Sequence, residues 1–216
     1  MKAAVIQFPG SNCDLDLMYA LDQLGFDPEL VDHNATDLSD YDAIFLPGGF
    51  SFGDYLRSGA VARFSPIIEA LKAEDAKGKI IVGICNGFQI LTEAGLLPGQ
   101  LMMNEHPGFI CDEVDLQIEN GDSNFSKQYD TNKINLPVAH GEGRYVANDA
   151  TIKQLEANHQ VIFKYLTNVN GSTNQIAGIT NQRGNVFGMM PHPERAIEAV
   201  ISSTDGKAFF TSILNK

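Results

Sequence analysis

One segment of this chain, Lys79–Gly95, constrains the fold more than any other part of the sequence. Residues 80–84 are apolar and mostly β-branched, which predicts a buried strand. Beyond Cys85, apolar residues recur at helical spacing up to Gly95, a residue type that commonly ends a helix. A buried strand that turns into a helix at a single residue is typical of α/β proteins whose sheet is mostly parallel.

The corner residue of this segment is Cys85, which lies between Gly83 and Gly87. The pattern Gly-x-Cys-x-Gly is the thiol version of a nucleophile elbow, in which small neighbours relieve crowding around a sharp turn. The positive end of the following helix favours a thiolate, and the N–H of Asn86 is available to a developing oxyanion. The same pattern is equally compatible with a buried cysteine that packs as a small hydrophobic residue.

The rest of the chain extends this α/β pattern. Its first half alternates predicted strands and helices, which indicates right-handed crossovers and a parallel sheet with helices on both faces. Its second half contains mostly predicted strands, which we interpret as an antiparallel extension of the same sheet. No internal repeat or linker marks a boundary, so we expect one flavodoxin-like α/β domain over residues 1–216.

The predicted elements follow from hydrophobic spacing and from turn residues. The polar segment 120–135 is predicted to be a surface loop. Strands are predicted at residues 2–8, 29–32, 42–46, 80–84, 102–116, 135–145, 161–166 and 176–189. Helices are predicted at residues 14–24, 61–71 with a break at Ser65-Pro66, 86–94, 150–158, 196–202 and from about 205 onward.

The composition argues against several kinds of partner and site. With a formal net charge of −12, the chain is unsuited to a nucleic acid or an anionic membrane surface. Three cysteines without CxxC spacing argue against disulfides and zinc, and the five scattered histidines do not suggest a metal site. Free thiols, together with no predicted signal peptide and no long apolar stretch, lead us to expect a cytoplasmic protein.

A thiol nucleophile needs a base, and His192 is the strongest candidate among the histidines. Pro191 and Pro193 keep the neighbouring backbone extended, so residues 192 and 194 project to the same side. Glu194 can therefore reach the imidazole and fix its tautomer. The alternative interpretation is a proline-rich surface turn with an exposed histidine and a solvated glutamate.

The turn at Gly48-Gly49 follows a predicted strand, and no side chain obstructs its N–H groups. A donor on Gly49 could complete an oxyanion hole with Asn86. Because ligands of parallel sheets bind beyond the carboxyl ends of the strands, we expect Gly49 and Cys85 to face one crevice. The alternatives are an ordinary glycine turn and a phosphate-binding loop, although the segment lacks the sequence patterns of the latter.

Two further features leave more than one interpretation open. Residues 140–142 (His-Gly-Glu) follow an apolar run and suit either contact with a polar ligand or a hairpin turn. Gln89 lies about one helical turn beyond the elbow and could meet the polar end of a substrate. Cys13 and Cys111 are predicted to be structural.

Four segments, taken together and in this order, resemble a known family. They are residues 48–59 (Gly-Gly-Phe-Ser-Phe-Gly-Asp-Tyr-Leu-Arg-Ser-Gly), 83–89 (Gly-Ile-Cys-Asn-Gly-Phe-Gln), 140–145 (His-Gly-Glu-Gly-Arg-Tyr) and 188–195 (Gly-Met-Met-Pro-His-Pro-Glu-Arg). The chain resembles class I glutamine amidotransferases over nearly its whole length. Within that family it is most similar to the stand-alone glutaminase subunits of phosphoribosylformylglycinamidine synthases.

The resemblance implies a catalytic triad of Cys85, His192 and Glu194 that hydrolyses L-glutamine to glutamate and ammonia. Together with the residue pattern, it implies an oxyanion hole formed at Gly49 and Asn86. The residues that we predict to bind the substrate are Gly48, Gln89, His140, Gly141 and Glu142.

The resemblance also implies partners. Ammonia would pass to a large synthetase subunit, which would use ATP and magnesium to amidate formylglycinamide ribonucleotide in de novo purine biosynthesis. A small third subunit would bridge the two. We expect this chain to hold no cofactor and no metal of its own.

Two other kinds of protein remain as alternatives. A related cysteine-elbow hydrolase, such as an intracellular peptidase or a stress-response protein, would resemble the first half of the chain. We would not expect such a protein to carry the His-Pro-Glu segment so far downstream. A non-catalytic small-molecule-binding module would have the same elbow with its cysteine merely packed.

Overall fold

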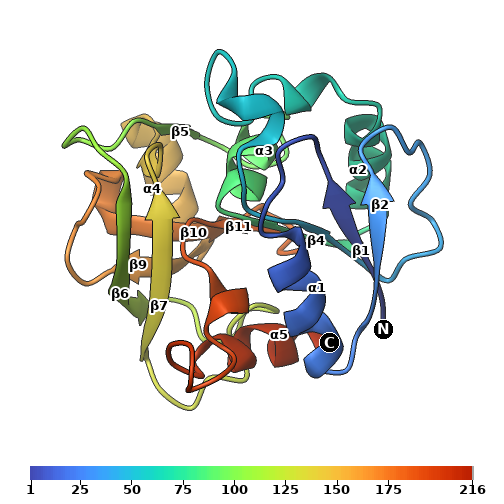
Figure 1. Cartoon of the computed structure of the whole chain (residues 1–216). Helices are drawn as coiled ribbons and strands as arrows, with labels where there is room; N and C mark the ends of the chain where they lie inside the picture. Colours follow the sequence, from blue (N-terminus) through green and yellow to red (C-terminus); the bar gives the residue numbers. More distant parts are fainter. Residues whose placement is uncertain (216) are drawn as a thin grey trace.

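A nine-stranded sheet runs through the computed structural model, which describes residues 1–215 (Figure 1). The strand order is β2-β1-β3-β4-β11-β10-β9-β6-β7. Neighbouring strands from β2 to β11 are parallel, and those from β11 to β7 are antiparallel, which confirms the predicted parallel sheet with an antiparallel extension. The strands are β1 (Lys2–Gln7), β2 (Asp27–Asp32), β3 (Ala43–Leu46), β4 (Ile80–Ile84), β6 (Ile110–Ile118), β7 (Lys133–His140), β9 (Val161–Tyr165), β10 (Ile176–Thr180) and β11 (Val186–Met189).

The central parallel strands are buried on both faces, since every residue of β3, β4 and β11 is buried. Figure 1 shows α1 (Asp14–Gln23) and α5 (Gly206–Leu214) on one side of these strands. On the other side lie α2 (Ile67–Ala76) and α3 (Asn86–Glu93), so the prediction of helices on both faces is confirmed. A fifth helix, α4 (Asp149–Ala157), belongs to the second half of the chain. Across the described residues, every helix falls short of the length and apolarity that a membrane crossing requires.

Three of the predicted strands are each divided in two by a turn. Residues 102–116 become β5 (Gln100–Met102) and β6, and residues 135–145 become β7 and β8 (Arg144–Val146). Residues 176–189 become β10 and β11, and β5 pairs with β8 in a small separate sheet. Each dividing segment contains a glycine, a residue that weakens a strand and often marks a bend in it.

The polar segment 120–135 is not only a surface loop. Phe125 is fully buried, and its ring centroid lies 4.6 Å from that of Phe187 and 6.3 Å from that of Phe209. The loop therefore anchors itself between the sheet and α5. The prediction was wrong at this residue because one aromatic side chain within a polar run produces no periodic pattern.

The helix predicted at residues 196–202 does not form. A 3-10 turn at Pro193–Arg195 ends there, and the carbonyl of Ala196 accepts a hydrogen bond from the N–H of Gly206 at 2.8 Å. That carbonyl is thus used by the first turn of α5 and not by a local helical bond. Serine and threonine at residues 202–204 are also weak helix formers, so nothing local opposes this arrangement.

The loops that follow β1 and β3 are joined by backbone hydrogen bonds. The N–H of Cys13 donates to the carbonyl of Gly48 at 3.3 Å, and that of Phe50 donates to Gly10 at 2.9 Å. The strand order changes direction at β1, where the neighbours β2 and β3 lie on opposite sides. Ligands of open parallel sheets bind at such a position.

We expect the substitution Gly206→Ala to destabilise the fold. A Cβ at this position would lie 2.0 Å from the carbonyl oxygen of Pro193, so α5 or the turn that carries Glu194 must shift. Chemical denaturation should show a loss of roughly 1–3 kcal/mol in unfolding free energy. Gly121→Ala is the control, because no atom lies within 4 Å of the added carbon. Equal denaturation midpoints for the two variants would contradict this packing.

Candidate functional site

Cys85 occupies the corner between β4 and α3, in a backbone conformation that side chains rarely adopt (φ 51°, ψ −106°). The flanking glycines make this corner possible. A Cβ on Gly87 would lie 2.1 Å from the carbonyl oxygen of Leu46, and one on Gly83 would lie 2.6 Å from the backbone of Gly87. The geometry is therefore that of the predicted elbow, with Cys85 at the N-terminus of α3.

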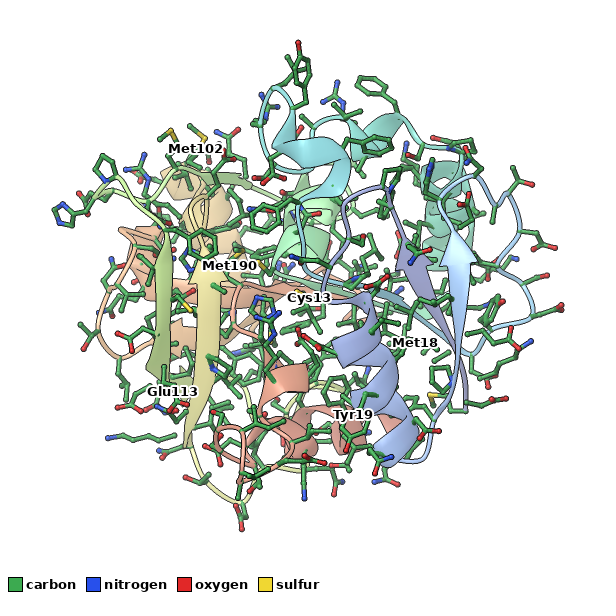
Figure 2. The ribbon with its side chains drawn as sticks, viewed as in Figure 1. Cys13, Met18, Tyr19, Met102, Glu113 and Met190 are labelled. Atoms are coloured by element: carbon green, nitrogen blue, oxygen red, sulfur yellow. The ribbon has the colours of Figure 1, made fainter. Side chains whose placement is uncertain are left out.

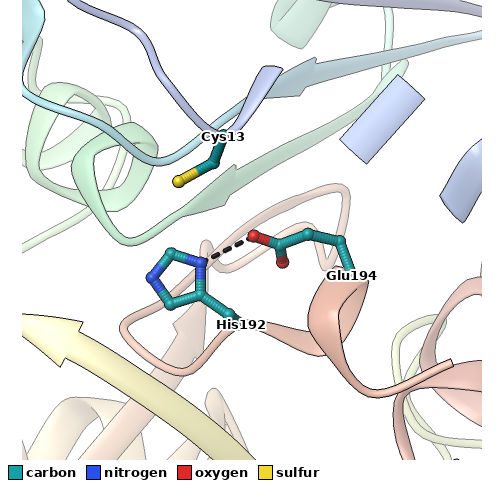
Figure 3. A group of neighbouring side chains, drawn as sticks. All are labelled: Cys13, His192 and Glu194. Carbon is teal, nitrogen blue, oxygen red and sulfur yellow. Dashed lines mark hydrogen bonds and ion pairs between the residues drawn. The ribbon is translucent and has the colours of Figure 1, made fainter. Parts of the chain in front are cut away.

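His192 and Glu194 form a buried pair (Figure 3). Nδ1 of His192 lies 2.6 Å from Oε1 of Glu194, and both side chains are 1% exposed. This is the contact expected from the sequence, although Glu194 lies in a 3-10 turn and not in an extended segment. Because Nδ1 is engaged by Glu194, Nε2 of the ring is left to face the rest of the site.

The surroundings of His192 favour its charged form. Burial by itself lowers the pKa of His192, but the negative charge of Glu194 and the neighbouring Cys85 outweigh burial and raise the pKa to about 10. The imidazole is therefore protonated at neutral pH. A protonated ring can donate a proton to a leaving group in the first step of an acyl transfer.

Gly48 lets the thiol and the imidazole approach each other. A Cβ on Gly48 would lie 2.8 Å from Cε1 of His192, 3.1 Å from Sγ of Cys13 and 3.4 Å from Cβ of Cys85. The three side chains therefore surround the space that a larger residue at position 48 would fill. The structure therefore shows Gly48 as a position that permits close packing. Gly48 does not line either of the two cavities described next.

Two cavities meet at Cys85 and share part of their walls. The first, here called the acidic chamber, has a volume of about 140 Å³, and the second, here called the thiol cavity, has about 270 Å³. Both are lined by Cys85, Gly49, Phe50, Phe109 and Ala139. Only the acidic chamber contains Asp54, Ser58, Gln89, His140, Gly141 and Glu142, and only the thiol cavity contains Asn12, Cys13, Cys111, His192 and Arg195.

A hydrogen-bond network shapes the acidic chamber. Asn86 accepts from the N–H of Ser51 at 3.1 Å and donates to Oε1 of Gln89 at 2.8 Å. Nε2 of Gln89 donates to the carbonyl of Glu142 at 2.8 Å, and Oε2 of Glu142 accepts from the N–H of Ser58 at 3.0 Å. The network ties residues 51–58 to the turn at 140–143, so Gln89 positions the chamber wall as well as lining it.

Asp54 is a chamber residue that the sequence did not single out. It has a positive φ of 55°, and its Oδ1 is buried without a hydrogen-bond partner in the structure. Burial raises the pKa of Asp54 to about 6, against a lowering by a hydrogen bond with Ser58 and with a smaller rise from the charge of Glu142. The Phe-Gly-Asp sequence before it suggests a turn, but no sequence pattern shows that its carboxylate points into a cavity.

Two backbone N–H groups beside Cys85 have the properties of oxyanion-hole donors. Asn86 is the first residue of α3, where N–H groups lack intrahelical acceptors. Gly49 has φ 143°, and a Cβ there would lie 2.7 Å from the backbone nitrogen of Asn12. The next residue, Phe50, uses its N–H in a loop hydrogen bond, while no hydrogen bond of the Gly49 N–H is found within residues 1–215.

His140 is a second buried imidazole, 2% exposed. Burial and the charge of His192 lower the pKa of His140 to about 4. Its Nδ1 lies 3.1 Å from Oδ1 of Asn104, which also accepts from the N–H of Gly143. Asn104 therefore fixes the ring and the turn beside it.

The chain can now be compared with known proteins. Residues 1–209 match the CobB/CobQ-like glutamine amidotransferase domain. The chain belongs to this family. It is 56% identical over 218 residues to phosphoribosylformylglycinamidine synthase subunit PurQ of Lacticaseibacillus casei, with 100% of this chain and 96% of that protein covered. The relative from Lacticaseibacillus paracasei has the same name, identity and coverage.

Solved structures of glutamine amidotransferases have the same fold. The structure of PurLQS from Thermotoga maritima contains a chain with a TM-score of 0.93 and 49% identity, with 99% of this chain and 97% of that chain covered. A glutamine amidotransferase from the same organism has a TM-score of 0.68 at 13% identity, with 100% and 96% covered, and shows the fold alone.

In this glutamine amidotransferase, Cys13 lies closer to the candidate site than the sequence suggested. Figures 2 and 3 show it at the start of α1, with its sulfur directed toward the pair of His192 and Glu194. Ligand atoms of these three residues lie within 4.8 Å of one another. The guanidinium of Arg195 lies 3.1 Å from Sγ of Cys13, and this fixed positive charge disfavours a metal cation there. In the sequence, only the position of Cys13 after the first predicted strand indicated that this residue could lie near the site.

The substitution Gly48→Ala should abolish most of the activity that depends on Cys85 without unfolding the protein. The added carbon would displace the imidazole of His192, and a misplacement of about 1 Å can cost roughly 100-fold in rate. The prediction is tested by measuring glutamate release from glutamine, with circular dichroism to check that the variant is folded. Gly121→Ala is the control. Unchanged kcat in Gly48→Ala would show that the close approach is unimportant.

The neutral state of His140 should make stability depend on pH. The pKa of His140 is about 4 in the folded protein, whereas an unperturbed histidine, as in the unfolded chain, has a pKa of 6.5. Between these two pH values the unfolded chain therefore binds more protons than the folded protein. The unfolding free energy should therefore fall by on the order of 3 kcal/mol as pH decreases from about 6.5 to about 4. Denaturation midpoints across this range should show a weaker dependence in His140→Gln. Parallel curves for the two proteins would mean that His140 is not held neutral.

Proposed function

We propose that this chain is the glutaminase subunit of a phosphoribosylformylglycinamidine synthase. It hydrolyses L-glutamine to glutamate and ammonia, and a synthetase subunit uses the ammonia to amidate formylglycinamide ribonucleotide in de novo purine biosynthesis. The observation that carries this proposal is the position of Cys85. Its corner borders a chamber with two carboxylates on one side and a buried, protonated His192 on the other.

In the proposed reaction, the sulfur of Cys85 attacks the side-chain amide carbon of glutamine. The N–H groups of Gly49 and Asn86 stabilise the negative charge that develops on the amide oxygen. Protonated His192 donates its proton to the leaving nitrogen, and a thioester with Cys85 remains. Neutral His192 then takes a proton from water, which attacks the thioester and releases glutamate. Glu194 holds the ring and stabilises its charged form.

The acidic chamber suits the amino-acid end of the substrate. Asp54 and Glu142 both line this chamber and supply carboxylates, and an α-ammonium group pairs with such groups. An α-ammonium would also lower the energy of ionised Asp54, whose carboxylate otherwise lacks a partner for Oδ1. We propose Asp54 as a substrate-binding residue beside Gln89, His140 and Glu142.

The assembly is part of the proposal. The structural relative belongs to the structure of PurLQS, which supports a complex with a synthetase subunit. We propose that a small third subunit bridges the two. ATP and magnesium would belong to the synthetase subunit. We place the protein in the cytoplasm, where its three thiols stay reduced.

An electrophilic glutamine analogue tests the function. We expect one analogue per chain on the peptide that contains Cys85, protection by excess glutamine, and no labelling of Cys85→Ala. Because triad members act as a unit, Cys85→Ala and His192→Ala should each lower glutaminase activity by at least roughly 1,000-fold. Labelling of Cys13 in place of Cys85, or none with the synthetase subunit present, would refute the mechanism and favour a packed thiol.

A further inference from the structure

The turn at residues 140–143, part of which lines the acidic chamber, is held by one buried side chain, that of Asn104. Nδ2 of Asn104 donates to the carbonyls of His140 and Gly108, each at 3.0 Å. Oδ1 accepts from the N–H of Gly143 at 3.0 Å and lies 3.1 Å from Nδ1 of His140. Both polar atoms of this amide therefore have partners.

These contacts fix which way the amide of Asn104 points. Its NH₂ group must face the carbonyls of His140 and Gly108, because carbonyls only accept hydrogen bonds. Its oxygen must face the N–H of Gly143, which only donates. The atom beside Nδ1 of His140 is therefore an acceptor, so Nδ1 carries a hydrogen.

The ring of His140 then has one bare nitrogen, Nε2. Burial first, and the charge of His192 second, lower the pKa of His140 to about 4, so at neutral pH the ring is uncharged and carries one hydrogen only. Nε2 is buried and has no hydrogen-bond partner among residues 1–215. Because an unpaired buried acceptor costs free energy, a ligand that donates to Nε2 gains affinity.

The acidic chamber combines this nitrogen with two carboxylates. His140, Asp54 and Glu142 all line a space of about 140 Å³, and none of the three lines the thiol cavity. Oδ1 of Asp54 is likewise buried and unpaired among the described residues. A primary ammonium group carries three N–H donors and no acceptor, so it can pair with all three side chains.

We propose that Asn104 is a positioning residue for glutamine, because it holds His140 in the tautomer whose Nε2 accepts a hydrogen bond from the α-ammonium group of the substrate. This inference rests on the proposed glutaminase function and names the substrate group that His140 contacts. Asp54 and Glu142 supply the negative charge for this group. His140 supplies an acceptor that adds no further charge to the chamber.

The other states of His140 would oppose binding. With its hydrogen on Nε2, the ring would direct a donor at a group that has only donors, and a charged ring would also repel the ammonium. Asn104 disfavours the first state, since Nδ1 without a hydrogen would face the lone pairs of Oδ1. Burial disfavours the second.

Asn104→Asp tests the tautomer by NMR of the histidine nitrogens in the full chain. Wild-type His140 should show a hydrogen on Nδ1 and a bare Nε2. In Asn104→Asp, the new negative charge beside Nδ1 should favour the imidazolium form, which carries a hydrogen on both nitrogens. The carboxylates of Asp54 and Glu142 favour that form in both proteins, and the charge of His192 opposes it in both, so the comparison isolates position 104.

Asn170→Asp is the matched control. Asn170 is also buried, and its Nδ2 donates to the carbonyl of Gly143 at 2.8 Å, in the same turn. No hydrogen bond from Asn170 to the ring of His140 is found within residues 1–215. This change therefore disturbs the turn but should leave the hydrogen on Nδ1 of His140 in place.

Kinetics in the complete complex with the synthetase subunit identify the substrate group. We would compare hydrolysis of glutamine with that of glutaramate, the same molecule without the α-amino group. In Asn104→Asp and His140→Phe, KM for glutamine should rise roughly tenfold or more, because a hydrogen bond to a charged group is lost. KM for glutaramate should stay within about twofold of the wild-type value, since this substrate has no such bond to lose. In Asn170→Asp, any loss should be equal for the two substrates.

If glutaramate is not hydrolysed, its inhibition constant against glutamine takes the place of its KM. Equal losses for both substrates in Asn104→Asp and His140→Phe would overturn the inference, and so would a hydrogen on Nε2 in the wild type. His140→Phe decides the kinetics if Asn104→Asp does not fold, because Oδ1 of Asn104 keeps the N–H of Gly143 as a donor. A wild-type complex that forms no glutamate would instead refute the glutaminase function itself.

Discussion

Two opposite charges are buried together at the centre of this protein, on His192 and Glu194, and the site depends on their contact. Removing ions from water costs several kcal/mol each, and only a short hydrogen bond with good geometry offsets that cost. The 2.6 Å contact provides it, and the turn at residues 193–195 that creates the contact is held in place by the start of α5. The C-terminal helix therefore supports the position of Glu194, although it contributes no residue to either cavity.

Close backbone packing gives the site its second constraint. At Gly48, Gly83 and Gly87, an added carbon would meet a neighbouring group at less than 3 Å. The thiol, the imidazole and the backbone donors can approach one another because these positions lack side chains. The same packing separates the acidic chamber from the thiol cavity, and Cys85 lines both.

Much of this was predictable from local pattern. The strand and helix around Cys85 were predicted because buried strands and amphipathic helices have distinct periods, and the pair of His192 and Glu194 was predicted from the spacing of two residues. The segment after Arg195 was predicted as a helix and is not one, because Ala196 bonds to a residue ten positions away. Asp54 was not singled out from the sequence, and Cys13 was predicted to be structural. The orientation of both side chains depends on loops that meet only in the folded chain.

The sequence by itself determined the alternation of strands and helices, the elbow at Cys85 and the pairing of His192 with Glu194, because each depends on residues that are near one another along the chain. Only the tertiary structure decided that Asp54 and Glu142 face one side of Cys85 and that Cys13 and Arg195 face the other. The physical reason is that cavities and their charges arise where separate strand ends and loops pack together. Such packing depends on contacts between residues far apart in sequence, and local patterns carry no record of them.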